Sequence, residues 1–265
     1  MPITSLNGHA LYYEITGSGS EPLILFNGIT MSTAAWTLML PLLEAHYQLI
    51  RFDFIGQGQS DKPNCECYTL IEQADIAAAL LTQCGIERVH LVGLSYGGIV
   101  AQHFAHRHPH RLKTLFLAST LAWSDHANRT ISDSWVTADK VGGLDLRLAI
   151  SLPWLYSSHY LALLDERRLA ELKTFASFVN WPTVIRLING IKYHDARTWL
   201  NEIITPTQVI VGNEDRLTPL YQSELLASSI PHATLEVLPN AGHVLHIEAP
   251  DTFAHSIIRF CQPHH

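Results

Sequence analysis

The sequence predicts an α/β fold: a mostly parallel, twisted sheet flanked by helices, with an inserted helical cap. Short apolar runs of strand composition alternate with helix-like segments over much of the 265 residues, and this order is typical of a parallel sheet. The alternation stops between about Leu121 and Ile204, where only helix-like pieces occur, and then resumes. A serine flanked by glycines, Ser95, stands at one of the predicted strand-to-helix turns.

The first elements are strands joined by glycine-containing turns. Residues 9–15 alternate between apolar and polar side chains, which is typical of a half-buried strand. Residues 23–26 are continuously apolar, as expected for a strand buried on both faces, and they lead through a loop to a predicted helix over 33–46. Residues 48–52 form the next strand, followed by the glycine-rich turn 53–61. Pro63 follows this turn where a dinucleotide-binding loop would open a helix, so the turn does not match such a loop and we interpret it as structural.

The middle of the chain continues the alternation. Thr69 and Glu72 form a capping box, after which apolar residues at helical spacing predict a helix. The strand-like run 89–92, in which three of four residues are Val or Leu, predicts a strand that leads into the serine turn and then into a helix ending near Pro109. Residues 113–118 form another strand.

The interruption predicts a separate helical segment. Helix-like patterns cover 144–157, 165–179 and 182–193. In the second of these, the apolar positions fall on one helix face: Leu169, Leu172, Phe175, Ala176 and Val179. We therefore divide the chain into a core domain of residues 1–121 and 205–265 and a cap, or lid, of residues 122–204.

The C-terminal part returns to alternating elements. A predicted strand over 207–212 precedes a helix that runs through Ser228, and a strand over 234–238 precedes a last helix over 250–261. We interpret the closing histidine pair, residues 264–265, as a tail.

The turn around Ser95 has the pattern Gly-x-Ser-x-Gly. Glycines at 93 and 97 let a strand and a helix approach closely, so the serine can adopt a strained backbone and expose its hydroxyl. This context predicts a nucleophile. The alternative is a glycine-rich turn whose serine only caps the helix.

Two further loops supply the partners that a serine nucleophile needs. Asp215 and His243 each follow a predicted strand, in the chain order nucleophile, acid, histidine, and loops after parallel strands meet at one sheet edge. The histidine removes the serine proton, and the carboxylate fixes the tautomer of the imidazole. Each residue alone is also compatible with an ordinary turn. Glu214 is an alternative acid, and we expect His246 to be a packed side chain.

Acyl chemistry also needs hydrogen-bond donors for the negative charge that develops on the carbonyl oxygen. The backbone amide of Tyr96, directly after the serine, is one candidate, and that of Ile29 is the second. Their side chains are expected to line the acyl pocket. Asn27, Trp123, Trp154 and Leu245 are further candidates for the pocket wall, although apolar cap residues more often form the cap's own core.

In these motifs the chain resembles the α/β-hydrolase superfamily, and the resemblance extends over nearly its whole length. The resemblance is carried by Phe26-Asn27-Gly28-Ile29, Asp53-x-x-Gly56-x-Gly58-x-Ser60, Gly93-Leu94-Ser95-Tyr96-Gly97-Gly98, Gly212-x-x-Asp215-x-x-Thr218-Pro219 and Ala241-Gly242-His243-x-x-x-x-Glu248-x-Pro250. Within it, the chain is similar to the small carboxylesterase and enol-lactonase-like branch with a helical cap. The resemblance implies a serine esterase that needs no cofactor.

Asn27 departs from the family pattern, which usually has histidine there. Asn-Gly at this point also resembles the loop of 3-hydroxyacyl-ester synthases and of some intracellular polyester depolymerases. Three hypotheses therefore stay open. The first is hydrolysis of an ester, lactone or thioester with a small-to-medium apolar acyl group. The second is acyl transfer on the same residues, and the third is a slow-turnover ligand receptor on the same fold.

Composition limits the partners. Seventeen Lys and Arg against 24 Asp and Glu give a net charge of −7, without the basic patch that nucleic-acid binding requires. No apolar run approaches the roughly 20 residues that span a bilayer, and the first residues lack the pattern of a signal peptide. We therefore expect a cytoplasmic protein that acts on a small molecule, whereas the oligomeric state stays open.

Cysteine and histidine usage does not predict a metal site. The four cysteines are too few for a disulfide framework and suit a reducing compartment, and Cys65-x-Cys67 has the wrong spacing for zinc. Sixteen histidines include a group within 103–110. Helical spacing puts His103 and His106 on one face, but no nearby carboxylate or cysteine completes a ligand set, so we interpret them as surface residues near a helix end.

Overall fold

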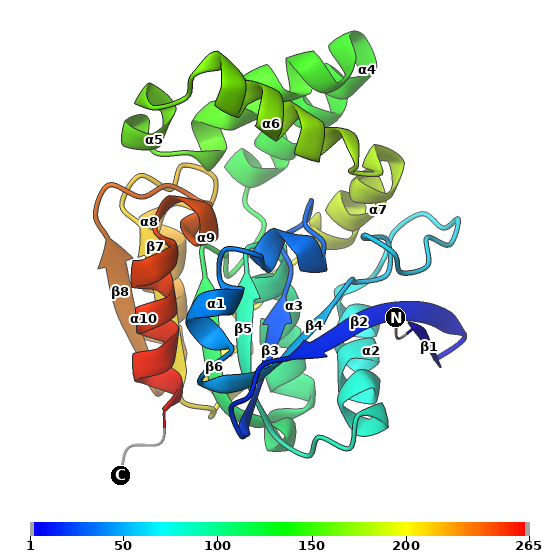
Figure 1. Ribbon diagram of the computed structural model, residues 1–265, viewed down its shortest axis with the longest axis vertical. Coiled ribbons are helices and arrows are strands. Elements are labelled where there is room, and N and C mark those ends of the chain that lie inside the picture. The colour runs from blue at the N-terminus through cyan, green and yellow to red at the C-terminus, as the bar shows by residue number, and fades with distance from the viewer. Residues whose placement is uncertain (1–2, 263–265) are drawn as a thin grey trace.

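The computed structural model describes residues 3–262. Their strands form one eight-stranded sheet (Figure 1). The strand order is β1-β2-β4-β3-β5-β6-β7-β8. Only β1–β2 and β2–β4 pair antiparallel, and every other neighbouring pair is parallel. The strands are β1 (Ile3–Leu6), β2 (His9–Thr16), β3 (Glu21–Phe26), β4 (Tyr47–Phe52), β5 (Val89–Leu94), β6 (Leu112–Ala118), β7 (Thr207–Gly212) and β8 (Ala233–Leu238).

The predicted fold class is confirmed, with one strand added. β1 was not predicted, because its four residues are too short to show a period in the sequence. It pairs with β2 at the antiparallel end of the sheet. The terminal histidine pair, residues 264–265, lies outside the described residues.

The two-residue period of the strands divides the apolar core between the two faces of the sheet. In β3, Ile24 and Phe26 join one buried cluster, whereas Leu23 and Leu25 join the other. The same division recurs in the neighbouring parallel strands, so the sheet is buried on both sides. This explains why these strands read as continuous apolar runs in the sequence.

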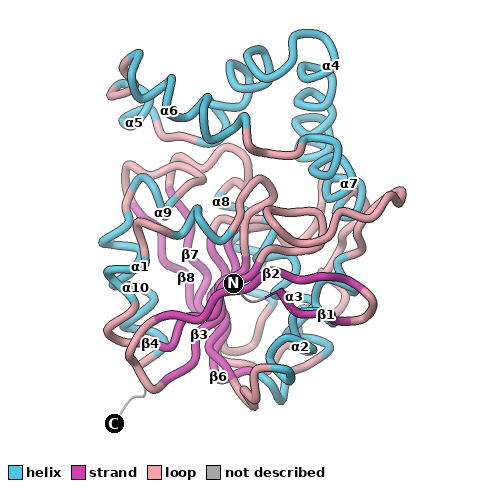
Figure 2. The backbone as a smooth tube through the Cα atoms, turned by 45° about the vertical axis from the view of Figure 1, so that its right-hand side comes forward, coloured by secondary structure: helices cyan, strands magenta, loops and turns pink. Residues whose placement is uncertain are grey.

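Helices cover both faces (Figure 2). The first cluster includes side chains of α2 (Leu70–Gln83), α3 (Tyr96–Arg107) and α8 (Leu220–Ser229). The second includes side chains of α1 (Leu40–Leu43) and α10 (Pro250–Cys261). Short elements complete the layers: η1 (Thr33–Trp36), η2 (Pro109–Arg111), η3 (Leu200–Glu202) and α9 (Leu245–Glu248).

Two helix predictions can be compared in detail. The capping box of α2 is confirmed, because the Thr69 hydroxyl accepts from the Glu72 amide while the Glu72 carboxylate accepts from the Thr69 amide. The single helix predicted over 33–46 is wrong, since two short helical segments, η1 and α1, occupy this stretch. Pro41 explains the break, because a proline ring clashes with a preceding helical turn and fits only the start of a new helix.

Four helices lie above the carboxyl ends of the parallel strands (Figure 1): α4 (His126–Leu155), α5 (Ser158–Ala162), α6 (Glu166–Ser177) and α7 (Trp181–Ile191). We call them the cap helices. α4 begins earlier than predicted and bends at Gly143, whose φ of 59° is not helical. A third apolar cluster draws its buried members from α4 and α7 alone: Ile131, Trp135, Trp181, Val184 and Ile188.

The apolar face predicted for residues 165–179 is not buried. α6 contains no buried residue, and Phe175 is 73% exposed. The helix contacts α4, but this contact leaves none of its side chains buried. Within the described residues, no helix combines the length and the apolar character needed to span a bilayer.

Candidate active site

Ser95 occupies a strained turn between β5 and α3. Its φ and ψ are 56° and −117°, a conformation that costs a non-glycine residue about 1–3 kcal/mol. Two contacts fix it: the Ser95 amide donates to the Ala118 carbonyl over 2.8 Å, and the Thr120 hydroxyl donates to the Ser95 carbonyl over 2.8 Å. Because the backbone is held from two sides, the direction of the Cα–Cβ bond of Ser95 is fixed.

Gly97 is required for the close approach of the turn to the neighbouring strand. A Cβ atom on Gly97 would lie 2.2 Å from the carbonyl oxygen of Phe26, which is backbone and cannot move aside alone. Gly212 has the same role at the end of β7, where a Cβ atom would lie 2.2 Å from the Ala241 carbonyl. Gly97 therefore lets the serine turn approach the end of β3, and Gly212 lets the end of β7 approach the loop that carries His243.

Asp215 lies in the turn after β7, and its side chain is fully buried. Its Oδ1 accepts from the amides of Leu217 (3.0 Å) and Thr218 (2.8 Å), and its Oδ2 accepts from the Thr218 hydroxyl (2.8 Å). A buried carboxylate needs such partners, because an unpaired one would carry a large desolvation cost. These bonds also fix the direction in which Oδ2 points.

His243 connects the other two side chains. Its Nδ1 lies 2.9 Å from Asp215 Oδ2, and its Nε2 lies 2.8 Å from the Ser95 hydroxyl. A carboxylate can only accept, so Nδ1 carries the proton and Nε2 presents its lone pair to the serine. The structure thus brings the three predicted residues into one chain of hydrogen bonds, and Glu214 is not part of it.

The residues of the two predicted amide donors border the same cavity as Ser95. Ile29 and Tyr96 both line the cavity above the serine. The Tyr96 amide is in the first turn of α3, where backbone N–H groups have no acceptor within the helix. In the Ile29 loop, Gln57 donates to the carbonyls of Gly28 (2.8 Å) and Ile29 (3.2 Å). Sequence reasoning missed Gln57, because it treated residues 53–61 only as a turn.

Asn27 does not line the cavity. It is fully buried, its Nδ2 donates to Phe52 O (2.8 Å) and Gln57 Oε1 (3.2 Å), and its Oδ1 accepts from Trp36 Nε1 (2.7 Å). All of its polar atoms are therefore engaged within the protein. Its position supports the Ile29 loop rather than contacting a substrate.

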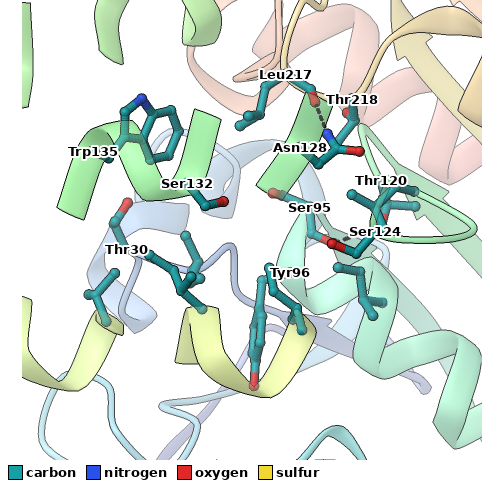
Figure 3. Close-up of a pocket in the computed structure, with 16 residues that line it drawn as sticks. Thr30, Ser95, Tyr96, Thr120, Ser124, Asn128, Ser132, Trp135, Leu217 and Thr218 are labelled. Carbon is teal, nitrogen blue, oxygen red and sulfur yellow. Dashed lines mark hydrogen bonds between the residues drawn. The ribbon is translucent and has the colours of Figure 1, made fainter. Parts of the chain in front are cut away.

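The cavity lies between Ser95 and the cap helices, and its volume is about 60 Å³ (Figure 3). Half of its sixteen lining residues are apolar, among them Ile99, Val184 and Leu217, while seven others carry a hydroxyl and one is an asparagine. Among the described residues that line it, none is Asp, Glu, Lys, Arg or His. The cavity therefore suits an uncharged group, because a charge placed there would find no counter-charge.

Three other predicted wall residues lie elsewhere, which corrects the expected pocket. Leu245 is fully buried in the core beneath α10. The Arg197 guanidinium carbon lies over Trp123, 4.0 Å from the centre of the indole ring, and Trp123 borders a separate surface depression. Trp154 is 36% exposed on α4. Hydrophobicity alone selected these residues, whereas the direction of each side chain depends on how its own segment packs against the rest of the protein.

Glu214 and His246, the two other residues considered for the site, make contacts outside the chain of hydrogen bonds from Ser95 to Asp215. Glu214 accepts from the Ser158 amide over 2.8 Å and pairs with Arg216, and the hydrogen bond to Ser158 lowers the pKa of this carboxyl. His246 is buried against Trp36, and burial lowers the pKa of its imidazole to about 3. Its prediction as a packed side chain is confirmed.

The end of α4 is bonded to the loops that carry Asp215 and His243. The Glu248 carboxylate accepts from the amides of Gly242 (3.1 Å) and Ser157 (3.2 Å). Arg216 donates to the carbonyls of Pro153 (3.0 Å) and Tyr156 (3.2 Å). Burial raises the pKa of Glu248, while its hydrogen bonds oppose that shift. Sequence reasoning used Glu248 only as a motif residue and gave Arg216 no role.

The histidine-rich segment has other partners. His103 Nε2 lies 3.2 Å from His194 Nδ1, and His106 pairs with Glu202 at 2.9 Å. His103 is partly buried rather than a surface residue, and burial lowers its pKa to about 4. Within residues 3–262, no three His, Cys, Asp or Glu side chains gather as metal ligands would. All four cysteines are free thiols.

Comparison with known proteins decides the family. The sequence profile of the Alpha/beta hydrolase family matches residues 23–256. This chain belongs to the α/β-hydrolase family. Over 250 residues, this chain is 28% identical to the Pantoea ananatis protein named "Putative carbamate hydrolase RutD". The match covers 92% of this chain and 90% of the relative.

Two further proteins show how widely the likeness extends. A poly(3-hydroxyalkanoate) depolymerase of Ectopseudomonas oleovorans is 32% identical to this α/β hydrolase, covering 91% of this chain and 84% of the relative. The crystal structure of MGS-M2, an α/β hydrolase enzyme from a Medee basin deep-sea metagenome library, superposes with a TM-score of 0.92 at 31% identity, covering 98% and 96% of the two chains. The protein is thus a hydrolase of the α/β type.

Proposed function

We propose that this α/β hydrolase is a serine esterase that cleaves a carboxylic ester of a small-to-medium, uncharged acyl group through an acyl-enzyme. The observation that carries the proposal is the position of His243, with Nε2 2.8 Å from the Ser95 hydroxyl and Nδ1 2.9 Å from Asp215. The Nε2 contact is within the distance at which a general base can remove the serine proton, and the Nδ1 contact lets the carboxylate orient the imidazole.

The proposed reaction begins when Ser95 Oγ attacks the carbonyl carbon of the ester and its proton passes to His243 Nε2. Asp215 stays ionised and stabilises the imidazolium that forms. The amides of Ile29 and Tyr96 donate to the oxyanion, and each such donor is worth on the order of 3 kcal/mol in the barrier. The alcohol then leaves with the proton of His243, and the acyl group stays on Ser95.

A water molecule completes the proposed cycle. His243 removes its proton, the hydroxide attacks the acyl carbon, and the acid leaves as the proton returns to Ser95. The cavity of about 60 Å³ has room for roughly four to six groups of the size of a water molecule, which favours a short acyl chain. The names of the carbamate hydrolase and depolymerase relatives add carbamates and hydroxyalkanoate esters to the compounds that need testing.

The decisive experiment is stopped-flow hydrolysis of p-nitrophenyl acetate, butyrate and octanoate by the wild-type protein and by Ser95→Ala. We expect a burst of p-nitrophenol, highest kcat/KM for a short chain, and loss of activity in Ser95→Ala. Full turnover by Ser95→Ala would refute the proposal. Product analysis with a competing alcohol tests the acyltransferase alternative, because a transferase would form a new ester in preference to the free acid.

A further inference from the structure

The hydroxyl of Thr218 contacts both side chains that support the proposed nucleophile. Thr218 is buried in the turn after β7, and its Oγ1 lies 2.8 Å from Asp215 Oδ2 and 3.2 Å from His243 Nδ1. Asp215 Oδ2 and His243 Nδ1 are themselves 2.9 Å apart. A hydroxyl oxygen, a carboxylate oxygen and a ring nitrogen therefore form a closed triangle of contacts.

The chemistry of these three atoms fixes where the protons lie. An ionised carboxylate has no proton, so Asp215 Oδ2 accepts from the Thr218 hydroxyl and from Nδ1–H of His243. Because the only proton of the hydroxyl is used on Oδ2, the Thr218 oxygen can meet Nδ1 only with a lone pair. The Nδ1 proton thus has two acceptors, a principal one at 2.9 Å on Asp215 and a weaker one at 3.2 Å on Thr218.

The same hydroxyl completes the hydrogen bonding of the buried carboxylate. Asp215 accepts from two amides on Oδ1, and on Oδ2 it accepts from His243 and from the Thr218 hydroxyl, which together fill the roughly four acceptor positions of a carboxylate. The Asp215 side chain has no exposed surface, so bulk water cannot replace a lost donor. Without the hydroxyl, Oδ2 would lose the bond that orients it toward Nδ1.

The turn that carries this hydroxyl is held from two directions. The Thr218 amide donates to Asp215 Oδ1 over 2.8 Å, within the turn itself. The carbonyl of the preceding residue, Leu217, accepts from Asn128 Nδ2 of the cap helix α4 over 2.6 Å. The backbone of Thr218 is therefore fixed on both sides, and its hydroxyl is supplied to the triangle in one place.

We propose that Thr218 is a positioning residue for the proposed base, whose hydroxyl keeps Asp215 Oδ2 aligned with His243 Nδ1 and accepts part of the Nδ1–H hydrogen bond. The proposal rests on the esterase function proposed above. When His243 takes the Ser95 proton and becomes cationic, the hydroxyl presents the negative end of its dipole to Nδ1–H. This contact strengthens in the transition state, so its loss should lower kcat and leave KM unchanged.

Two substitutions at Thr218 separate the hydroxyl from the shape of the side chain. Thr218→Val removes the hydroxyl and keeps the shape, whereas Thr218→Ser keeps the hydroxyl. With p-nitrophenyl butyrate, we expect Thr218→Val to lose about 10-fold in kcat, the effect of one hydrogen bond to a charged group, with KM within about two-fold of wild type. Thr218→Ser should stay within about three-fold of the wild-type kcat. Wild-type kcat in Thr218→Val, or an equal loss in Thr218→Ser, would overturn the positioning role.

Thr207→Val is the matched control for a general loss of stability. Thr207 is fully buried at the start of β7, the strand that leads to Asp215, and its hydroxyl donates to the Thr205 carbonyl over 2.8 Å. Each valine variant loses a hydroxyl that makes a buried hydrogen bond, so both should unfold at lower urea concentration than the wild type. Only Thr218→Val should lower kcat. A similar fall in kcat in the two variants would trace the loss to stability and contradict the proposal.

A stoichiometric reaction keeps the test independent of ester turnover. In the reaction with dimethyl p-nitrophenyl phosphate, Ser95 Oγ attacks phosphorus, p-nitrophenolate leaves, and the serine proton passes to His243. We expect the rate of this single release to fall about 10-fold in Thr218→Val and to recover in Thr218→Ser.

The outcomes of this reaction distinguish the two proposals. Equal release rates in the wild-type protein and Thr218→Val would contradict the positioning role even if esters are hydrolysed. No release by the wild-type protein would contradict the activation of Ser95 by His243, and the role of Thr218 with it. Release without hydrolysis of any ester would contradict the esterase function alone, and the comparison of the Thr218 variants would still decide the positioning role.

Discussion

The backbone amide of His243 donates a 2.9 Å hydrogen bond to the carbonyl of Leu155. The loop that carries the proposed base is therefore bonded directly to the last turn of α4, a cap helix. The Glu248 carboxylate joins the same loop, through Gly242, to Ser157 at the start of α5, the next cap helix. The position of the imidazole thus depends on the cap helices as well as on the sheet.

We expect Glu248→Leu to lower both stability and turnover. The change leaves the amides of Gly242 and Ser157 without their acceptor, at a cost of about 1–3 kcal/mol for each amide that stays buried. Glu248→Gln keeps one acceptor oxygen and should lose less. Urea denaturation and kcat with p-nitrophenyl butyrate measure the two effects. Unchanged kcat in Glu248→Leu would show that the loop holds His243 without this carboxylate.

Asp215→Asn should reduce kcat by about 10³- to 10⁴-fold. The asparagine amide lacks the negative charge that keeps the proton on Nδ1 of His243 and stabilises the imidazolium. Glu214→Gln is the matched control, since Glu214 bonds to Ser158 and Arg216 instead. Its kcat should stay within a few-fold of the wild-type value. Steady-state kinetics with one ester suffices, and a larger loss in Glu214→Gln than in Asp215→Asn would reverse the assignment of the acid.

Gln57→Met should lower kcat by about 10-fold with little change in KM. The side chain is buried and holds the carbonyls of Gly28 and Ile29, so its removal allows the Ile29 amide to shift from the oxyanion, and one lost donor costs at most about 10²- to 10³-fold. Gln59→Met is the control, because Gln59 is exposed. If both variants retain wild-type kcat, the Ile29 loop does not depend on Gln57.

Acid should destabilise the protein through the His103–His194 pair. Burial lowers the pKa of His103 to about 4 and that of His194 to about 3, whereas both bind a proton near pH 6.5 in the unfolded chain. The unfolded state therefore takes up more protons between these values, and the free energy of unfolding falls as pH drops below about 6.5. Each histidine contributes up to about 2 kcal/mol of this loss between pH 7 and pH 5.

The His103→Gln variant tests this pH dependence. Removing one titrating group should make the acid side of the stability curve shallower by about 1 kcal/mol per pH unit. His110→Gln replaces an exposed histidine on η2 and should leave the slope as it is. Urea denaturation at pH 7, 6 and 5 provides the measurement. Parallel curves for wild type and His103→Gln would indicate that other groups cause the acid sensitivity.

Sequence alone determined most of the core fold, because strand and helix periods and turn residues are local signals. A few neighbouring residues suffice to predict each of three features: the continuous apolar run of β3, the capping box of α2 and the glycine-flanked turn at Ser95. Chain order then placed Ser95, Asp215 and His243 on loops after parallel strands, and topology brings such loops to one edge.

Only the tertiary structure decided how the cap helices lie over that edge. Packing between segments distant in sequence decides which side of α4 faces the cavity. It also decides why α6 buries none of its apolar residues and why Trp154 lies outside the cavity wall. Gln57 gained its role in the same way. Its partner, Gly28, lies 29 residues away, so no local pattern could have predicted this contact.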